Sequence, residues 1–269
     1  MTYSKILRNR FPEISLRWED LLLLESFQIA YLPDRVTIEE FATLLHTYPE
    51  AYSFLVSKHP PISSFLESIL KENKAPADKD LIKEQCQEAL WEIGDLIIFN
   101  KHPAQFDAHA PIKWEIDEIS ALTSLEGKIL ADVGAGAGRI TFLVAPMVQT
   151  VYAVEPLASF RSFMKEKAVK QSVKNVIIME GTLDSIPLPD NSLDVLITSN
   201  AMGWNLPKEL KEIERVVKAG GHAIHLLQSD IQVENPHHLT LSSSPWNYTC
   251  LKEKHIKGMK LRYYKEMSI

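Results

Sequence analysis

The stretch Lys128-Ile-Leu-Ala-Asp-Val-Gly-Ala-Gly-Ala-Gly-Arg139 decides the fold of this chain. Its apolar start predicts a short buried strand, and the residues from Arg139 onward predict a helix. Glycine is scarce, at ten in 269 residues, yet three glycines fall within this one turn. Glycine accepts positive φ angles and lets a ligand approach the backbone, and the first N–H groups of the following helix point toward that ligand. The turn therefore predicts a ligand site, with close packing of helix on sheet as the alternative.

Short β-rich runs alternate with helical runs over the second half of the chain. This alternation is typical of a parallel sheet that helices cover on both faces. Ligands of such sheets bind beyond the carboxyl ends of the strands, where the strand order reverses. We therefore predict an α/β fold with a doubly wound, mostly parallel sheet. Strands are expected at 128–132, 150–154, 175–179, 192–199, 221–227 and 259–266. One helix is expected to begin at 139, a second to end at 170 and a third to span 208–218. Whether a further strand follows near the end stays open.

The residues before about 125 contain a single glycine, Gly94, and predict helices. We expect an N-terminal all-helical domain over residues 1–104 and the α/β domain over 105–269. Thr37 and Glu40 form a capping-box pattern that predicts a helix over 38–47. The role of this helical domain stays open between capping the acceptor site, forming a homo-oligomer and binding a partner protein. Further helices are expected over 18–32, 51–58, 62–71, 81–97 and 112–122, with a linker at 71–80 and irregular chain at 100–111.

The composition excludes several classes of function. Residues 1–120 hold 12 Lys and Arg against 20 Asp and Glu, which argues against a nucleic-acid footprint. The basic stretch 252–265 is interpreted as a solvated surface. Two cysteines form no disulfide framework, which favours a reducing, cytoplasmic location. The first residues are too polar for a secretory signal, and no apolar run approaches membrane-spanning length, so we expect no membrane association.

Two classes of ligand use a glycine turn of this kind. The dinucleotide pattern Gly-x-Gly-x-x-Gly needs a glycine where this chain has Arg139, which disfavours a nicotinamide-dependent oxidoreductase. The pattern Asp-x-Gly-x-Gly-x-Gly is complete, and it resembles motif I of the class I S-adenosylmethionine-dependent methyltransferases. The resemblance implies a Rossmann-like sheet, S-adenosylmethionine as cofactor and S-adenosylhomocysteine as product. It implies that the cofactor contacts Asp132, on its ammonium side, and Gly134, Ala135, Gly136 and Gly138.

Later segments extend the resemblance over residues 105–228. Glu155, followed by Pro156, ends the second predicted strand, where an acidic residue can accept both ribose hydroxyls. NAD-dependent enzymes place an acid in the same position, so Glu155 alone does not separate the two classes. The run 210–226 resembles the helix, Gly-Gly turn and fifth strand of the family.

The stretch 180–197 resembles the adenine-side loop and fourth strand of the family. Many members carry an aspartate where this chain has Thr182. Either the Thr182 hydroxyl accepts weakly from the adenine amino group, or Asp184 reaches it. The backbone N–H of Leu183 is a further candidate contact to the adenine.

The acceptor side carries a less specific signal. Some amine- and amide-methylating members show Asn-Pro-Pro-Tyr after the fourth strand, where this chain has Asn200-Ala-Met-Gly-Trp204. We expect Asn200 to face the cofactor and Trp204 to form a wall of the acceptor site, with core packing of Trp204 as the alternative. The segment 106–114 resembles a lid of small-molecule methyltransferases, which implies that Asp107, His109 and Trp114 border the site. His109 is the candidate catalytic base because imidazole titrates near neutral pH, with a water-exposed histidine as the alternative.

We therefore predict methyl transfer from S-adenosylmethionine to a small or medium-sized acceptor by in-line displacement. A non-catalytic S-adenosylmethionine-binding module that acts through a partner protein is one alternative, and methylation of a protein acceptor is another. No metal site is expected, because the pair His237-His238 has no third ligand in register.

Overall fold

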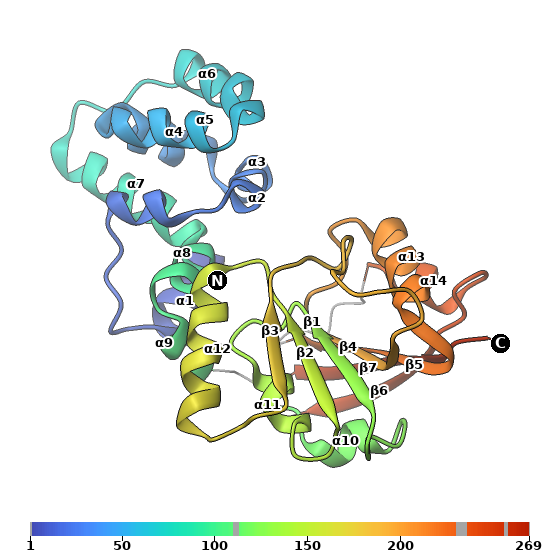
Figure 1. Cartoon of the computed structure of the whole chain (residues 1–269). Coiled ribbons are helices and arrows are strands. Elements are labelled where there is room, and N and C mark those ends of the chain that lie inside the picture. The colour runs from blue at the N-terminus through green and yellow to red at the C-terminus, as the bar shows by residue number, and fades with distance from the viewer. Residues whose placement is uncertain (1, 110–112, 230–235, 256–257, 269) are drawn as a thin grey trace. The chain divides into compact units, whose positions relative to one another are not determined.

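The computed structural model describes residues 2–109, 113–229, 236–255 and 258–268 (Figure 1). The chain divides into two compact units, Met1–His109 and Ala110–Ile269. The division thus follows His109, whereas the sequence predicted it after residue 104. Each unit has its own hydrophobic core.

The first unit is entirely helical over its described residues. Its core is built from fully buried aliphatic and aromatic side chains such as Phe41, Leu44, Leu55 and Leu66. Its helices are α1 (Tyr3–Arg10), the 3₁₀ helix η1 (Trp18–Leu23), α2 (Ser26–Ile29), α3 (Leu32–Arg35), α4 (Ile38–Thr47), α5 (Pro49–Lys58), the 3₁₀ helix η2 (Pro60–Ile62), α6 (Ser63–Glu72), α7 (Lys79–Glu92), α8 (Gly94–Lys101) and α9 (Pro103–Ala108).

The single helix predicted over 18–32 is wrong, because η1, α2 and α3 divide this stretch. Polar side chains divide it by bonding the backbone at the helix starts. The carboxylate of Asp20 accepts from the N–H of Arg17 at 2.9 Å, and the Gln28 amide oxygen accepts from the N–H of Glu25 at 2.9 Å. Such local bonds compete with a continuous helix.

Helix α4 spans the predicted residues, but the predicted capping box is wrong. The Thr37 hydroxyl donates to the carboxylate of Glu92 on α7, and its backbone N–H donates to the same carboxylate at 2.8 Å. The predicted helix over 81–97 is interrupted at Ile93, just before Gly94. Glycine destabilises the interior of a helix because its backbone loses more conformational freedom on folding than that of other residues. The stretch 100–111, predicted irregular, contains α9, which Pro103 begins.

The second unit is built on one sheet with the strand order β3-β2-β1-β4-β5-β7-β6. The first five strands are parallel, and β7 pairs antiparallel with both β5 and β6. The doubly wound, mostly parallel sheet is therefore confirmed, and β6 supplies the strand that the sequence left open. The strands are β1 (Ile129–Val133), β2 (Thr150–Val154), β3 (Val176–Met179), β4 (Leu193–Ser199), β5 (Val217–Ser229), β6 (Thr249–His255) and β7 (Gly258–Glu266).

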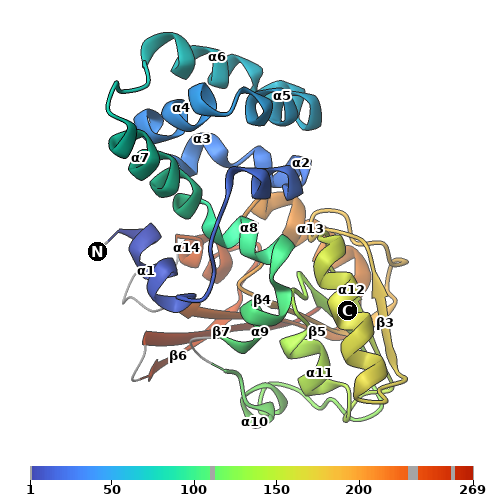
Figure 2. The same ribbon diagram turned by 90° about the vertical axis from the view of Figure 1, so that its left-hand side faces the viewer.

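Helices cover both faces of the sheet (Figure 1, Figure 2). Neighbouring residues of a strand point to opposite faces. Leu130 of β1 accordingly packs in the cluster that includes Ile140 of α11, whereas Ala131 packs in the cluster that includes Leu210 of α13. The helices of this unit are α10 (Ile116–Ser120), α11 (Arg139–Val144), α12 (Ala158–Lys170), α13 (Leu206–Val216) and α14 (His238–Ser242).

Two predicted elements differ in extent. Of the helix predicted over 112–122, residues 116–120 are helical and 112 lies outside the described residues. The Gly220-Gly221 pair lies within β5, where the pairing shifts: Val217 is opposite Leu193 and His222 is opposite Val195. The glycines therefore form a bulge at the start of β5.

Strand β1 lies between β2 and β4, so the strand order reverses beside it. Val133 is opposite Val154, and Asp132 is opposite both Ala153 and Ile197. The carboxyl ends of these three strands therefore meet at one edge, and the glycine turn that follows β1 lies at this switch point.

Each helix within the described ranges is too short or too polar to cross a membrane. In the same ranges, no three His, Cys, Asp or Glu side chains come together as a metal-binding group.

Asp78 is the N-cap of α7, because its carboxylate accepts from the N–H groups of Asp80, at 2.8 Å, and Leu81, at 3.3 Å. We expect Asp78→Ala to lower the free energy of unfolding of the helical unit by about 1 kcal/mol, the usual loss for a helix cap. Asp78→Ser, which keeps a capping oxygen, should stay close to the wild type. Urea denaturation followed by circular dichroism measures both; equal stability of the alanine variant and the wild type would contradict the cap.

Candidate functional site

The glycine turn is held by the end of β2. The N–H groups of Gly134 and Ala135 both donate to the carbonyl of Val154, at 2.8 and 3.1 Å. All three glycines of the turn have positive φ angles, between 54° and 79°. A Cβ on Gly134 would lie 2.2 Å from the Cβ of Ala201, and one on Gly138 would lie 2.7 Å from the ring of Phe142. A Cβ on Gly136 would meet nothing within 4 Å, so the turn opens to space at Gly136.

Glu155 directly follows β2 and lies against this opening. One carboxylate oxygen accepts from the N–H of Gly136 at 2.8 Å, and the other accepts from the N–H of Leu157 at 2.9 Å. The side chain is almost entirely buried, with 5% of the residue exposed. Burial raises the pKa of Glu155 to about 7, although the two N–H donors favour the ionised form and lower the pKa. The structure thus brings together two of the residues predicted for the cofactor, Glu155 and Gly136.

Arg161 of α12 fixes the backbone around Glu155, a role that the sequence analysis did not predict. Its guanidinium donates to the carbonyls of Glu155, at 2.9 Å, and Pro156, at 2.6 Å, and to the carboxylate of Glu180 at 2.7 Å. Glu180 follows β3, so Arg161 joins the carboxyl ends of β2 and β3.

Asp132 is buried inside β1 and has one unused oxygen. Oδ2 accepts from the backbone N–H and the hydroxyl of Thr141, at 2.9 and 2.6 Å. Oδ1 is buried and has no hydrogen-bond partner among the described residues. Burial raises the pKa of Asp132 to about 6, although the two hydrogen bonds from Thr141 lower it. An unpartnered buried acceptor beside the glycine turn fits a ligand N–H group or a bound water.

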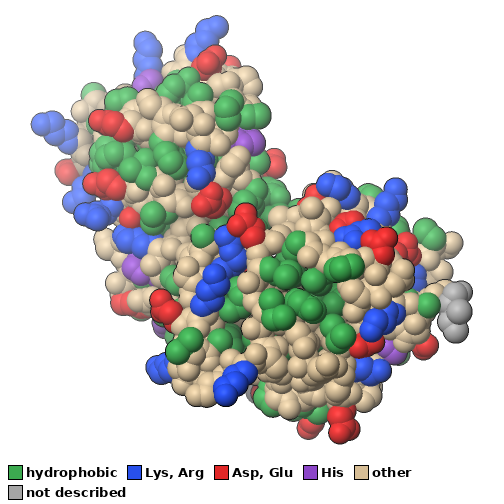
Figure 3. Space-filling model, in the orientation of Figure 1, with side chains coloured by type: hydrophobic (Ala, Val, Ile, Leu, Met, Phe, Trp, Pro, Cys, Tyr) green, Lys and Arg blue, Asp and Glu red, His purple; other side chains and the backbone are tan. Residues whose placement is uncertain are grey.

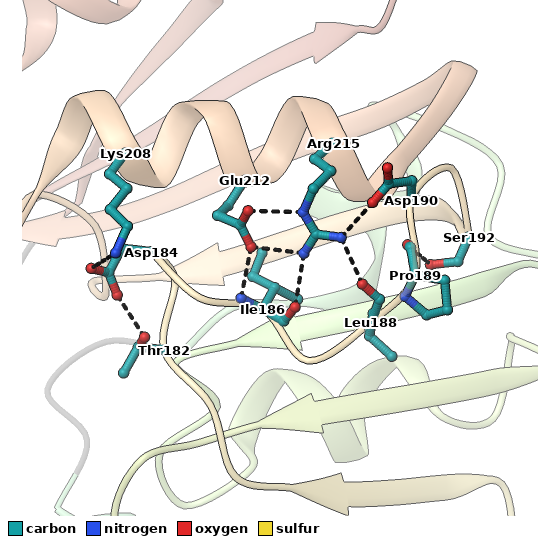
Figure 4. A network of polar contacts seen from close by, with 10 residues as sticks. All are labelled: Thr182, Asp184, Ile186, Leu188, Pro189, Asp190, Ser192, Lys208, Glu212 and Arg215. Carbon is teal, nitrogen blue, oxygen red and sulfur yellow. Dashed lines mark hydrogen bonds and ion pairs between the residues drawn. The ribbon is translucent and has the colours of Figure 1, made fainter.

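The adenine-side loop follows β3. The Thr182 hydroxyl donates to a carboxylate oxygen of Asp184 at 2.6 Å, and Lys208 of α13 bonds the other oxygen at 3.2 Å (Figure 4). Because the Thr182 proton is directed at Asp184, its oxygen keeps lone pairs for another donor. Leu183 turns its side chain into the core and is 6% exposed.

Arg215 holds the rest of this loop against α13 (Figure 4). Its guanidinium donates to the carbonyls of Ile186 and Leu188, at 2.9 and 2.8 Å, and pairs with Asp190 at 2.7 Å. Glu212 bonds Arg215 and also accepts from the N–H of Ile186 at 2.9 Å. The loop therefore has fixed backbone positions although it contains no helix.

Asn200 ends β4 in the left-handed region, with φ of 52°. Its N–H donates to the carbonyl of Leu226 at 3.0 Å, and its amide oxygen accepts from the N–H of Gln228 at 2.9 Å. Asn200 therefore joins the ends of β4 and β5 at the edge that carries the glycine turn. Trp204, four residues on, is 57% exposed, so the alternative of core packing is wrong.

The three predicted lid residues fall in different units. Asp107 and His109 belong to the helical unit, where the His109 ring lies 3.3 Å from a carboxylate oxygen of Glu13. Trp114 belongs to the α/β unit and is 7% exposed, with the ammonium of Lys260 4.9 Å from its ring centre.

Two histidines, His225 of β5 and His238 of α14, lie close to hydroxyl groups of neighbouring strands. His225 is fully buried, and burial lowers its pKa to about 3, so the ring is neutral at physiological pH. Its Nδ1 lies 3.0 Å from the Thr198 hydroxyl, and the Nδ1 of His238 lies 2.8 Å from the Tyr263 hydroxyl.

The α/β unit is similar to known methyltransferases. Residues 131–225 match a family model described as a methyltransferase domain. An uncharacterized methyltransferase, YcgJ of Bacillus subtilis, is 32% identical over 92 residues, which cover 34% of this chain and 36% of that protein. A demethylmenaquinone methyltransferase of Geobacillus is 29% identical over 121 residues, which cover 43% of this chain and 51% of that protein.

Among solved structures, a SAM-dependent methyltransferase from Aquifex aeolicus superposes with a TM-score of 0.47 and 20% identity, covering 55% of this chain and 86% of that one. This chain spans about a third to a half of the length of the curated relatives named above.

The raised pKa of Glu155 has a consequence for stability. Burial raises the pKa of the carboxyl group to about 7 in the folded chain, from its ordinary value of 4.5. Its contribution to the free energy of unfolding is therefore fully present below pH 4.5 and is lost as the pH rises through 7. We expect the wild type to lose up to about 3 kcal/mol relative to Glu155→Gln between pH 5 and pH 8.

Urea denaturation of both ligand-free proteins at the two pH values measures this difference. Asp132 titrates in both proteins, so its own contribution largely cancels. An identical pH dependence of the two proteins would show that Glu155 does not titrate in this range.

Proposed function

We propose that this chain, whose residues 131–225 form a methyltransferase domain of the class I type, binds S-adenosylmethionine and transfers its methyl group to a small or medium-sized acceptor. The observation that carries the proposal is the pair of Glu155 and Gly136, a buried strand-end carboxylate bonded to the glycine at which the turn opens to space. This pair lies at the switch point of the sheet, where α/β folds bind their ligands.

The residues around the turn fit the parts of this cofactor. Each oxygen of Glu155 uses one lone pair on a backbone N–H and keeps another for a ribose hydroxyl. The unpartnered Oδ1 of Asp132 fits the ammonium side, directly or through water. Gly134, Ala135, Gly136 and Gly138 would line the amino-acid part, with Pro156 beside the ribose, Thr182 and Leu183 at the adenine, and Asn200 at the edge of β4.

When bound, the cofactor supplies a methyl group on a sulfonium, whose departure leaves a neutral thioether. Such a displacement asks the protein mainly to align the acceptor atom with the methyl group. A base is needed only where the acceptor atom carries a proton of high pKa. Within this proposal His109 remains the candidate base, and Asp107, Trp114 and Trp204 remain candidates for the acceptor side.

Two observations support a small acceptor over a nucleic acid. The demethylmenaquinone methyltransferase among the relatives acts, by its name, on a small molecule. The basic stretch 252–265 is partly neutralised, because Lys260 pairs with Glu118 at 2.7 Å, Arg262 with Glu253 at 3.1 Å and Lys265 with Glu214 at 3.6 Å. Cationic and anionic side chains are interspersed over the face of the α/β unit that Figure 3 shows.

The cytoplasmic location stays a prediction from the cysteines, Cys86 and Cys250, both of which are free.

Calorimetric titration of S-adenosylhomocysteine into the purified protein tests this function, with NADH as the control ligand. We expect binding of S-adenosylhomocysteine alone. Binding of NADH alone would indicate an oxidoreductase, and S-adenosylhomocysteine binding without turnover in an acceptor screen would indicate the non-catalytic module.

Glu155→Ala should weaken S-adenosylhomocysteine binding by about 1.5–3 kcal/mol, the usual value of hydrogen bonds to a charged group. Wild-type affinity should rise as the pH rises through about 7, because the ionised carboxylate is the acceptor, and the alanine variant should lose this dependence. Glu166→Ala, which removes an exposed carboxylate of α12, is the matched control and should bind as the wild type does. Unchanged affinity in Glu155→Ala would remove Glu155 from the site.

A further inference from the structure

The loop between β4 and α13 directly contacts the glycine turn. Its residues Asn200-Ala-Met-Gly-Trp-Asn205 contain no charged side chain. The Cβ of Ala201 lies where a side chain on Gly134 would begin, 2.2 Å from the ideal Cβ position. Trp204 is therefore carried by a loop that touches the proposed cofactor site.

One buried carboxylate fixes this loop on both sides of Trp204. Glu209 of α13 is 2% exposed. Its two oxygens accept from the N–H groups of Gly203, at 2.7 Å, and Asn205, at 2.8 Å. A buried carboxylate that lost these donors would be left unpaired at a high cost in free energy, so the loop backbone is strongly held.

A histidine closes the other side of the loop. Gly203 has φ of 117°, and a Cβ there would lie 2.4 Å from Nε2 of His237. The ring of His237 therefore packs directly on the Gly203 backbone. Leu239 of α14, two residues after His237, is 77% exposed.

The loop thus presents a large aromatic ring on a rigid backbone. Trp204 is 57% exposed, although burial of an indole from water is favourable. A ring whose backbone is fixed before a ligand arrives loses little freedom when the ligand binds. Because both oxygens of Glu209 are engaged and residues 200–205 are uncharged, this loop offers a ligand a flat apolar ring and no ionic partner.

We propose that Trp204 is the stacking surface for a flat, uncharged ring of the acceptor, and that Glu209 is the positioning residue that holds it. This inference rests on the proposed function and specifies the acceptor class of the same site. Stacking on an indole needs a planar ring, so a saturated molecule of equal size should bind less tightly.

Calorimetry on protein saturated with S-adenosylhomocysteine tests the inference, with 2-naphthol as the flat probe and decahydro-2-naphthol as its saturated counterpart. We expect 2-naphthol to bind with a Kd about fivefold or more below that of the saturated probe. Trp204→Ala should raise the Kd of 2-naphthol about tenfold, whereas Trp204→Phe, which keeps a flat ring, should stay within about threefold of the wild type. Equal binding of the two probes, or an unchanged Kd in Trp204→Ala, would overturn the stacking surface.

Glu209→Ala tests the positioning role. We expect it to raise the Kd of 2-naphthol about as much as Trp204→Ala does, while the Kd of S-adenosylhomocysteine stays within about twofold of the wild type. Equal weakening of both ligands would show a general structural role and overturn the assignment. If Glu209→Ala does not fold, Glu209→Gln replaces it, because an amide keeps one acceptor oxygen and should give an intermediate loss for 2-naphthol.

The outcomes separate this inference from the function on which it rests. Wild-type protein that binds S-adenosylhomocysteine but not 2-naphthol would overturn the acceptor class and leave the proposed function in place. Wild-type protein that binds no S-adenosylhomocysteine would overturn both.

Discussion

The hydrogen bond from the N–H of Gly136 to the carboxylate of Glu155 joins the two strand ends on which the site is built. The turn after β1 contains three glycines with positive φ and has few backbone bonds of its own, so its shape depends on β2. Val154 accepts two of its N–H groups, and Glu155 accepts a third. Because Arg161 in turn holds the carbonyl of Glu155, the end of β3 is tied to the same point through Glu180. A substitution at Glu155 therefore affects the shape of the turn as well as any ligand contact.

Acidic side chains that are buried or half-buried also hold the backbone elsewhere in the α/β unit. Asp194 accepts from the N–H of Ile129 at 2.8 Å at the start of β1, and Glu212 accepts from the N–H of Ile186. Glu209 does so for the loop after β4. Loop N–H groups lack the partners that a helix or a sheet supplies, and a carboxylate that accepts two of them satisfies both at once. The loops around the site are thereby rigid without secondary structure of their own.

The sequence predicted the helices and strands that have a regular apolar pattern. It missed the features that depend on a hydrogen bond between residues far apart in the sequence. Five parallel strands and their helices follow from alternating apolar runs, and the glycine turn follows from the local demand for positive φ. Thr37 formed a valid capping pattern, yet its hydroxyl bonds Glu92, which lies 55 residues away. Arg161 and Glu209 were missed for the same reason, since an arginine or a glutamate on an amphipathic helix gives no sign of which backbone groups it will meet. The lid prediction rested on a pattern of residue types, and it stays a prediction because its residues belong to two different units.

The proposed cofactor side and acceptor side of this unit differ in how they are built, and the difference has a physical cause. Around the glycine turn, the buried carboxylates of Glu155 and Asp132 have raised pKa values. In the proposed function they would face a ligand whose sulfonium and ammonium groups are cationic, so that binding would favour their ionisation. The loop after β4 carries no charged side chain. The carboxylate of Glu209, which belongs to α13, accepts from backbone N–H groups of this loop with both of its oxygens. Charge recognition is therefore confined to the part of the site that every reaction of this type shares. Under the same proposal, acceptor choice would depend on the shape of an exposed ring, which could change between proteins without disturbing the buried acids around the glycine turn.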